Sequence, residues 1–180
     1  MTRTIVVPAE LGGAALDELK GWLAITRDAE DAVLTGLLAS ALDAAEAFTG
    51  TMPLVQTCED IRPAACVWHV LGTRPIGAIT GVESVTADGI RQTLPIDAYQ
   101  IDLAADGTGS VRVTGITQHR IAVRFVAGLA PAWTSLPEGL RHGVVRLAAH
   151  LYRERDGDAL DRLPSAVSAL WRPWRRMRIA

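Results

Sequence analysis

Cysteine is scarce in this sequence, which contains only Cys58 and Cys66. Their spacing and their apolar, strand-like surroundings match neither a zinc knuckle nor a CxxC redox site. Free cysteine is among the most often buried residue types, so we expect two buried thiols in a reducing cytosol. A chain of 180 residues can bury enough surface to form a core without disulfide or metal cross-links.

Long apolar runs and secretion signals are also missing. No apolar run approaches the ~20 residues that are needed to cross a bilayer. The N-terminal sequence MTRTIVVPAELGG lacks the long apolar segment of a signal peptide. We therefore expect no membrane partner and a protein that is made and used on the cytosolic side.

Signatures of catalysis and of nucleotide binding are absent as well. The sequence contains no GxGxxG, no GxxxxGK[ST] and no GxSxG pattern. His142 and His150 lie two helical turns apart, too far to share a metal without distortion. Asp156, Asp158 and Asp161 lack the ligand spacing and the closing glutamate of a calcium loop. We expect no enzyme activity, no cofactor and no bound metal.

Charge is present but unevenly distributed. The net charge of the whole chain is only -2. Residues 1–110 carry six basic and fifteen acidic side chains, a charge of -9, whereas residues 111–180 carry twelve arginines and five acids, a charge of +7. This separation favours a protein that contacts a partner with one end over one that coats nucleic acid with its whole surface.

The pattern of apolar and turn-forming residues predicts an α+β fold. Apolar residues at helical spacing predict helices over residues 14–24, 29–49, 137–155 and 165–171, with Asp28 as N-cap of the second. Strands are expected over residues 4–7, 55–61, 65–71, 79–86, 90–94, 100–103, 110–113 and 121–126, with turns at Gly89 and Gly107.

These elements indicate a helical bundle of two N-terminal helices and a long C-terminal helix, with a central antiparallel β region over 54–128 and a C-terminal arm. Residues 1–163 are expected to form one domain, and 164–180 a helix and arm. Pro173 breaks the helical pattern of that last segment, so its final residues are expected to be extended.

The C-terminal arm breaks the usual rule for a protein surface. Trp171 and Trp174 lie among four arginines, and no acidic residue follows Asp161. Tryptophan and arginine often anchor protein interfaces, but they also suit phosphate backbones and membrane surfaces. Three interpretations stay open: the arm docks into a partner protein, it binds nucleic acid or lipid, or the two tryptophans fold back on the protein's own core.

Two stretches of the sequence resemble the phage head–tail connector, or adaptor, family, which includes the HK97-type connectors and related phage and gene transfer agent adaptors. The first is the early helix pair, from Leu16 to Ile25 and from Glu30 to Gly50. The second is the late helix from Leu140 to Arg155 with its sequel from Leu163 to Leu170. The β region over 54–128 is longer than in the smallest, mostly helical connectors.

The resemblance implies a structural virion protein, made in the bacterial host cytoplasm, that works at the head–tail junction of a phage or phage-like particle. It implies a ring, typically of twelve copies, which joins the DNA-filled head to the tail and passes double-stranded DNA without reading its sequence. The implied partners are the portal protein above the ring and a stopper or tail terminator protein on the tail side.

On this basis, the C-terminal segment is expected to dock into the portal, and charged residues of the two halves are expected to meet between neighbouring subunits. The expected portal-binding residues are Leu170, Trp171, Arg172, Trp174, Arg175, Arg176 and Arg178. The expected inter-subunit residues are Arg146, Arg153, Asp28, Glu30 and Asp31. Two alternatives remain: a module that uses the basic C-terminus to bind nucleic acid or a membrane surface, and another tail-completion protein.

Overall fold

The computed structural model describes residues 3–115, 120–154 and 163–175. It confirms the α+β class: the described residues form four α-helices and two antiparallel sheets. The chain divides into two compact units. We call them the β unit, formed by Met1–Ala9 and Val55–Leu129, and the helical unit, formed by Glu10–Leu54 and Ala130–Ala180.

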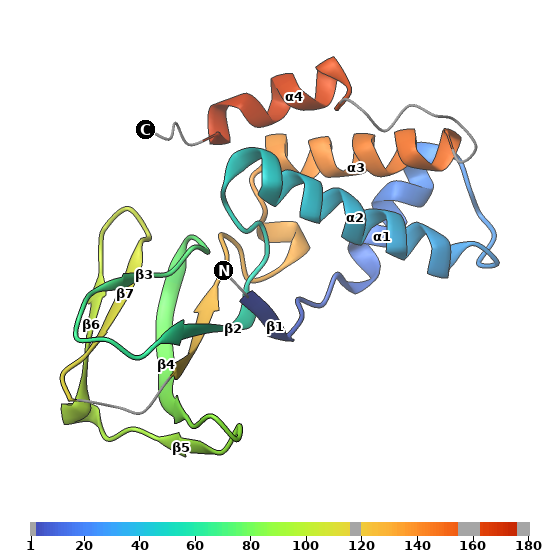
Figure 1. Cartoon of the computed structure of the whole chain (residues 1–180). Helices are drawn as coiled ribbons and strands as arrows, with labels where there is room; N and C mark the ends of the chain where they lie inside the picture. The colour runs from blue at the N-terminus through green and yellow to red at the C-terminus, as the bar shows by residue number, and fades with distance from the viewer. Residues whose placement is uncertain (1–2, 116–119, 155–162, 176–180) are drawn as a thin grey trace. The chain divides into compact units, whose positions relative to one another are not determined.

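The β unit consists of a five-stranded sheet with the order β1-β2-β8-β4-β5 and a three-stranded sheet with the order β3-β7-β6 (Figure 1). Its strands are β1 (Arg3–Val7), β2 (Gln56–Pro63), β3 (His69–Val70), β4 (Ile76–Val85), β5 (Arg91–Thr93), β6 (Tyr99–Leu103), β7 (Gly109–Val113) and β8 (Arg120–Ala127). Every strand that the sequence predicted has a counterpart here, although β3 is reduced to two residues.

Alternating burial shows how this unit forms its core. In β7, Gly109, Val111 and Val113 are buried while the residues between them are partly exposed. A side chain at position 109 would meet Ile76 of β4, since a Cβ there would lie 2.7 Å from its Cδ1 atom. The glycine therefore allows the two sheets to approach each other closely.

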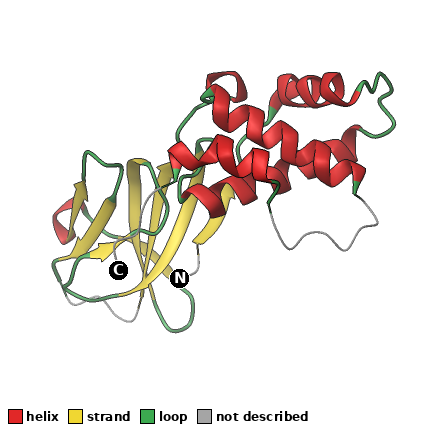
Figure 2. Ribbon diagram, turned by 90° about the horizontal axis from the view of Figure 1, so that it is seen from above, coloured by secondary structure: helices red, strands yellow, loops and turns green. Residues whose placement is uncertain are grey.

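The helical unit contains α1 (Gly12–Leu23), α2 (Asp31–Thr49), α3 (Glu138–Arg153) and α4 (Ser165–Trp171). These bounds agree with the four predicted helices to within two residues. Figure 2 shows the helices of this unit as a layer of their own. Glu18 of α1 accepts a 2.9 Å hydrogen bond from Nε1 of Trp133 and pairs with Arg141 of α3 at 3.4 Å, which fixes α1 against the rest of the unit.

Two local expectations need correction, the N-cap of the second helix and the burial of both cysteines. Helix α2 begins at Asp31, with Glu30 at the capping position and no side-chain capping bond. Asp28 instead pairs with Lys20, which lies close to it only in the folded unit. Cys58 is buried, but Cys66 is exposed because it lies in the loop between β2 and β3.

The division into units also differs from the expected boundary after residue 163. Helix α4 packs on α3 inside the helical unit, because Val167 and Trp171 are buried there. The β region forms a separate unit because its two sheets bury their own apolar residues, among them Val111, Val113 and Phe125.

Helix α2 is long and apolar enough, by length and composition alone, to cross a membrane, with a mean hydropathy of 1.3 over its most apolar stretch. The expectation that no run reaches this length is therefore wrong for α2. One such helix is weak evidence for a membrane, since core helices pass the same test. Its buried residues Leu34, Leu38, Ala41 and Ala45 form one stripe, as in a helix that packs along one face.

Candidate functional site

Helix α3 has two contrasting faces. Leu140, Val144, Leu147 and Ala148 are buried on one side. The other side carries a row of basic and imidazole side chains, which we call the basic stripe: His142, Arg146, His150 and Arg153. Arg146 and Arg153 are exposed and the two histidines are half-buried. Residues three, four and seven positions apart lie on one helix face, so these four side chains start from the same face of α3.

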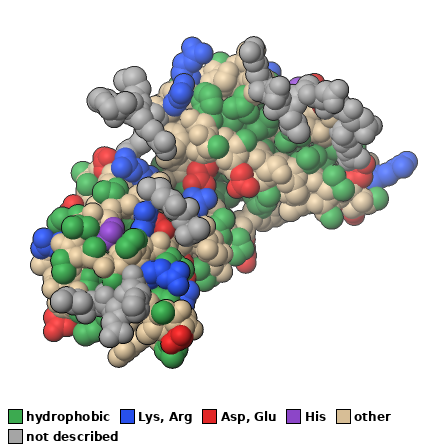
Figure 3. Space-filling view, viewed as in Figure 1, with side chains coloured by type: hydrophobic (Ala, Val, Ile, Leu, Met, Phe, Trp, Pro, Cys, Tyr) green, Lys and Arg blue, Asp and Glu red, His purple; other side chains and the backbone are tan. Residues whose placement is uncertain are grey.

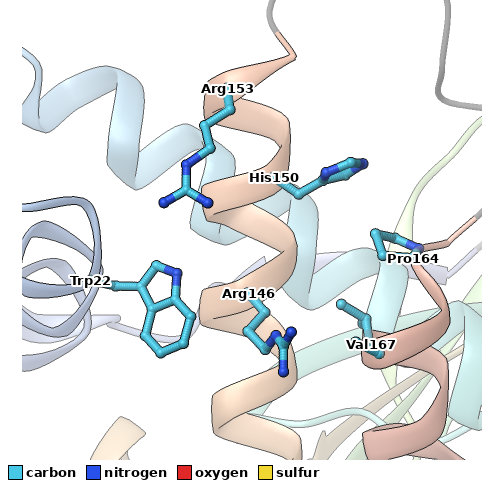
Figure 4. A pocket seen from close by; sticks show the side chains of 7 residues that line it. Trp22, Arg146, His150, Arg153, Pro164 and Val167 are labelled. Carbon is cyan, nitrogen blue, oxygen red and sulfur yellow. The ribbon is translucent and has the colours of Figure 1, made fainter.

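A pocket of about 170 Å³ opens over the basic stripe, and we call it the α3 pocket. It is lined by Trp22, Arg146, His150, Arg153, Pro164, Ala166 and Val167. In Figure 4, the Trp22 ring from α1 and the side chain of Arg153 lie to one side of α3, while His150 points toward Pro164 and Val167 near α4. The pocket therefore combines apolar walls from α1 and α4 with cationic groups from α3.

Trp22 forms the α1 wall of the α3 pocket and remains 45% exposed. Its ring meets His142 edge-on, with the ring centroids 5.2 Å apart. An aromatic side chain of this size is usually more deeply buried in a monomeric protein. Trp22 therefore gives the pocket an apolar surface that is available to a ligand.

The two arginines of the α3 pocket have no ion pair within the described part of the chain. The described ion pairs of α3 are Arg141 with Glu18 and His150 with Glu154, the latter at 3.2 Å. Guanidinium groups prefer to form paired hydrogen bonds with carboxylates or phosphates. As far as the described residues go, Arg146 and Arg153 are therefore available to bind an external anion.

The acids that were expected to contact a neighbouring subunit have partners inside the helical unit. Lys20 donates hydrogen bonds to Asp28 at 2.7 Å and to Asp31 at 2.8 Å. These bonds lower the pKa of Asp28 and raise that of Lys20. Glu30 accepts a 2.6 Å hydrogen bond from the hydroxyl of Tyr152. The acids thus fix the start of α2 on its own unit, and their role between subunits stays a prediction.

The structure places the predicted portal-binding residues in three different environments. Trp171 is fully buried, Leu170 and Trp174 are half-buried, and Arg172 and Arg175 are exposed. Arg175 lies over the Phe48 ring, with the guanidinium carbon 5.5 Å from the ring centroid. Arg176 and Arg178, with the expected extended arm, lie outside the described residues.

The burial of Trp171 corrects its expected role as a docking anchor. Its Nε1 atom donates a 3.2 Å hydrogen bond to the carbonyl of Leu140, and its ring lies 6.0 Å from that of Phe48. A Cβ at Gly143 would overlap the indole ring and lie 2.8 Å from its Cδ1 atom. Trp171 therefore holds α4 on α3, which is the third interpretation left open by the sequence, and Gly143 is the sequence signal that could have indicated it.

Trp174, unlike Trp171, keeps part of its side chain at the surface of the helical unit. It lies in the 3₁₀ turn Arg172–Trp174 that continues α4 beyond Trp171. Its Nε1 atom lies close to Gly139, where a Cβ would be 3.7 Å away. The turn places a half-buried tryptophan between the exposed Arg172 and Arg175.

The strongest charge cluster of the β unit has a structural role. Glu59 of β2 is nearly buried and accepts two hydrogen bonds from Arg91 of β5, at 2.7 and 2.8 Å, with Arg124 of β8 at 3.4 Å. This pairing lowers the pKa of Glu59. The cluster of Glu59, Arg91 and Arg124 therefore links three strands of one sheet.

Among the described residues, no group of three or more His, Cys, Asp or Glu side chains could hold a metal ion.

Replacing Glu59 with glutamine is expected to lower the stability of the β unit by about 1–3 kcal/mol at neutral pH, because it removes charge-assisted hydrogen bonds. The folded protein binds a proton at Glu59 more weakly than the unfolded chain does. The wild type should therefore lose this stability as the pH falls from about 4.5, the usual pKa of the group, through the lower pKa of the folded state.

Urea unfolding at several pH values tests this expectation. The difference between the wild type and Glu59→Gln should shrink as the pH falls, because a protonated Glu59 resembles glutamine. Asp88→Asn in the turn after β4, where the side chain is exposed, is the control and should change little. A pH-independent difference between the wild type and Glu59→Gln would contradict the assignment.

Comparison with known proteins gives one consistent result. No protein-family model and no curated protein sequence matches the chain. A chain in the neck of an empty GTA particle, computed with C6 symmetry, matches with a TM-score of 0.77 and 23% identity. A chain in the virion of a native gene transfer agent (GTA) particle matches with 0.77 and 24%, and one in the neck of a native GTA particle, computed with C12 symmetry, with 0.75 and 24%.

Each of these matches covers 100% of this chain and 98% of the matched chain. The β region, which distinguishes the sequence from small helical connectors, is therefore shared together with the helices. At 23–24% identity the likeness shows the fold. The chain has the fold of a protein that occurs in gene transfer agent particles.

Proposed function

We propose that the chain is a structural adaptor at the head–tail junction of a gene transfer agent or phage-like particle. It forms a ring beneath the portal protein, joins the DNA-filled head to the tail and leaves a channel for double-stranded DNA. It is not an enzyme. The observation that carries the proposal is the full-length fold match to chains of GTA necks, which were computed with C6 and C12 symmetry.

Charge distribution supports a ring that lets DNA pass. A channel that held many phosphates would retain the duplex, because each contact adds to the affinity. The net charge of this chain is only -2. On the visible face in Figure 3, Lys and Arg side chains are separated by uncharged surface and do not form one broad basic area. The modest charge agrees with twelve copies around double-stranded DNA that passes through the channel without being held or read.

Contacts between subunits are assigned to the basic stripe. Arg146 and Arg153 are exposed and have no ion pair within the described residues, so they are available to a neighbouring copy. The acids at the start of α2 would have to exchange their present partners to reach a neighbour. A ring needs two different faces on each subunit, and the arginines provide one of them.

The contact with the portal is assigned to the C-terminal turn and the residues after it. Trp174 replaces Trp171 as the apolar anchor, because Trp171 is fully buried. Arg172 and Arg175, together with Arg176 and Arg178 of the sequence, pair with portal carboxylates in this proposal. The opposite side of the ring contacts a stopper or tail terminator protein.

A truncation that spares Trp171 tests the portal contact. Removing residues 172–180 should weaken binding to the cognate portal protein by about a hundredfold or more, because an anchoring tryptophan and its arginines are lost together. The measurement is a pull-down or biolayer interferometry with purified portal rings, after circular dichroism shows that the truncated chain is folded. Unchanged portal binding would exclude this docking role.

Two controls complete the experiment. Removing residues 164–180 should unfold the helical unit, since Val167 and Trp171 belong to its core. Arg27→Ala, an exposed arginine before α2, should leave portal binding unchanged. Steep salt-sensitive binding of the isolated wild type to DNA or to anionic vesicles would favour the alternative that the basic C-terminus serves nucleic acid or membranes.

A further inference from the structure

The α3 pocket has the properties of a binding site for which no ligand has been assigned. Its cationic groups are Arg146 and Arg153, which lie two helical turns apart on α3. Both are exposed, and no carboxylate within the described residues pairs with either of them. The described acid that belongs to this face, Glu154, pairs with His150 instead. Two guanidinium groups that line one pocket and have no ion pair among the residues that the structure describes call for an anionic ligand.

The walls of the α3 pocket restrict the kind of anion that fits. Trp22, Pro164, Ala166 and Val167 contribute apolar surface from α1, from α4 and from the residue before α4. A phosphate would use only the arginines and would leave the Trp22 ring and Val167 facing water. A carboxylate on an apolar stem, beside an apolar neighbour, would use both parts of the pocket.

The size of the pocket also favours a side chain over a larger body. A volume of about 170 Å³ holds one or two side chains of a peptide segment. Tryptophan and arginine are both among the residue types enriched at the hot spots of protein interfaces. DNA contacts instead rely on many phosphates spread along a groove, whereas this pocket offers two arginines from a single helix.

We propose that the α3 pocket binds an acidic segment of a protein partner, in which an aspartate or glutamate bridges Arg146 and Arg153 and an adjacent apolar side chain packs on Trp22. This goes beyond the inter-subunit role proposed for the two arginines, because it defines the chemistry of the occupant and adds Trp22 and Val167 to the contact. In the proposed ring, the neighbouring copy supplies the segment, and only this last step rests on the proposed function.

A peptide titration followed by nuclear magnetic resonance tests the pocket on the full chain without portal or tail proteins. The probe is an acetylated and amidated peptide of alternating leucine and glutamate, and its matched control carries glutamine in place of glutamate. The readouts are the indole N–H signal of Trp22 and the backbone amide signals of α3. Saturable shifts confined to these signals, at millimolar peptide or below, are the expected result.

Matched variants make the titration specific. Arg146→Gln combined with Arg153→Gln should weaken peptide binding by about tenfold or more, because both charge-assisted contacts are lost. Arg27→Gln, which removes the same charge from an exposed position outside the pocket, should bind like the wild type. Both arginines of the pocket are exposed, so the folded state should survive the double substitution, and thermal unfolding checks this.

Several results would overturn the proposal. If the glutamine peptide bound as tightly as the glutamate peptide, the carboxylate would have no role. If inorganic phosphate or a short DNA duplex shifted the same signals with equal or higher affinity, the pocket would be a phosphate site. The aspartates Asp156, Asp158 and Asp161 follow α3 in the sequence. Binding that appears only after all three are changed to asparagine would make this chain's own acids the occupant.

Absence of saturable shifts in both the wild type and the triple asparagine variant would also exclude an acidic segment. Because the titration needs neither portal nor ring, its failure leaves the proposed adaptor function standing. Unchanged portal binding in the truncation experiment would count against the docking role and would in turn leave the pocket standing. The two proposals are therefore tested separately.

Discussion

Replacing Trp171 with alanine is expected to destabilise the helical unit by about 3–5 kcal/mol, the usual cost of truncating a fully buried large aromatic side chain and leaving a cavity. Trp171 is among the largest fully buried side chains of the protein. The substitution removes its contact with Phe48 and its hydrogen bond to the carbonyl of Leu140. Urea unfolding followed by far-UV circular dichroism measures the loss.

The control for this experiment is Trp22→Ala. Trp22 is 45% exposed and has its ring contact with His142, so its removal should cost only about 0.5–1.5 kcal/mol. A stable Trp171→Ala variant that has lost portal binding would mean that Trp171 is a docking anchor after all. That outcome would contradict its assignment to the core of the helical unit.

Replacing Gly143 with alanine is expected to destabilise the same unit by about 1–3 kcal/mol, although alanine is the better helix former. The added Cβ would overlap the indole of Trp171, whose ring has little freedom to move inside the core. The change in the free energy of unfolding, measured by urea titration, gives the cost of this overlap.

Gly139 lies one turn earlier in the same helix and provides the matched substitution. A Cβ at Gly139 would make ordinary contacts, 3.6 Å from the carbonyl oxygen of Leu170 and 3.7 Å from Nε1 of Trp174. Gly139→Ala should therefore be neutral or stabilising by up to about 1 kcal/mol, through helix propensity alone. Equal effects of the two substitutions would show that α4 does not pack on α3 through Trp171.

Local sequence signals predicted the elements of the fold well. Gly50 ends α2 with a φ of 72°, and Gly89 and Gly107 form turns with φ of 81° and 79°. These positions favour glycine because other residues pay a steric cost at positive φ. The apolar periodicity of α3 likewise identified its buried face, since a helix that packs on one side must repeat its apolar residues every three to four positions.

Features that depend on tertiary contacts were not predictable in the same way. Aspartate is a preferred residue type at an N-cap, but the carboxylate of Asp28 pairs with Lys20 of the preceding helix and does not cap α2. Trp171 and Trp174 lie three residues apart in the same arginine-rich stretch, yet one is buried and the other is half-buried. Composition cannot separate a core tryptophan from an interface tryptophan, because both roles need a large apolar side chain.

The candidate site shows the same limit. The basic stripe on α3 followed from helical periodicity, but its pairing with Trp22 and Val167 did not. These walls come from α1, which lies far from α3 in the sequence, and from α4, the next helix after it, and both meet α3 only after folding. The pocket around Arg146 and Arg153 could be recognised only once the structure showed the apolar residues beside them.

The central claim is that the chain forms a ring on the portal. Electron micrographs of the purified protein mixed with its cognate portal protein test it most directly. The account predicts stacked rings in which a twelve-fold layer of this chain lies on the portal and surrounds an open channel. Portal rings without an added layer, or single copies bound at scattered positions, would contradict it.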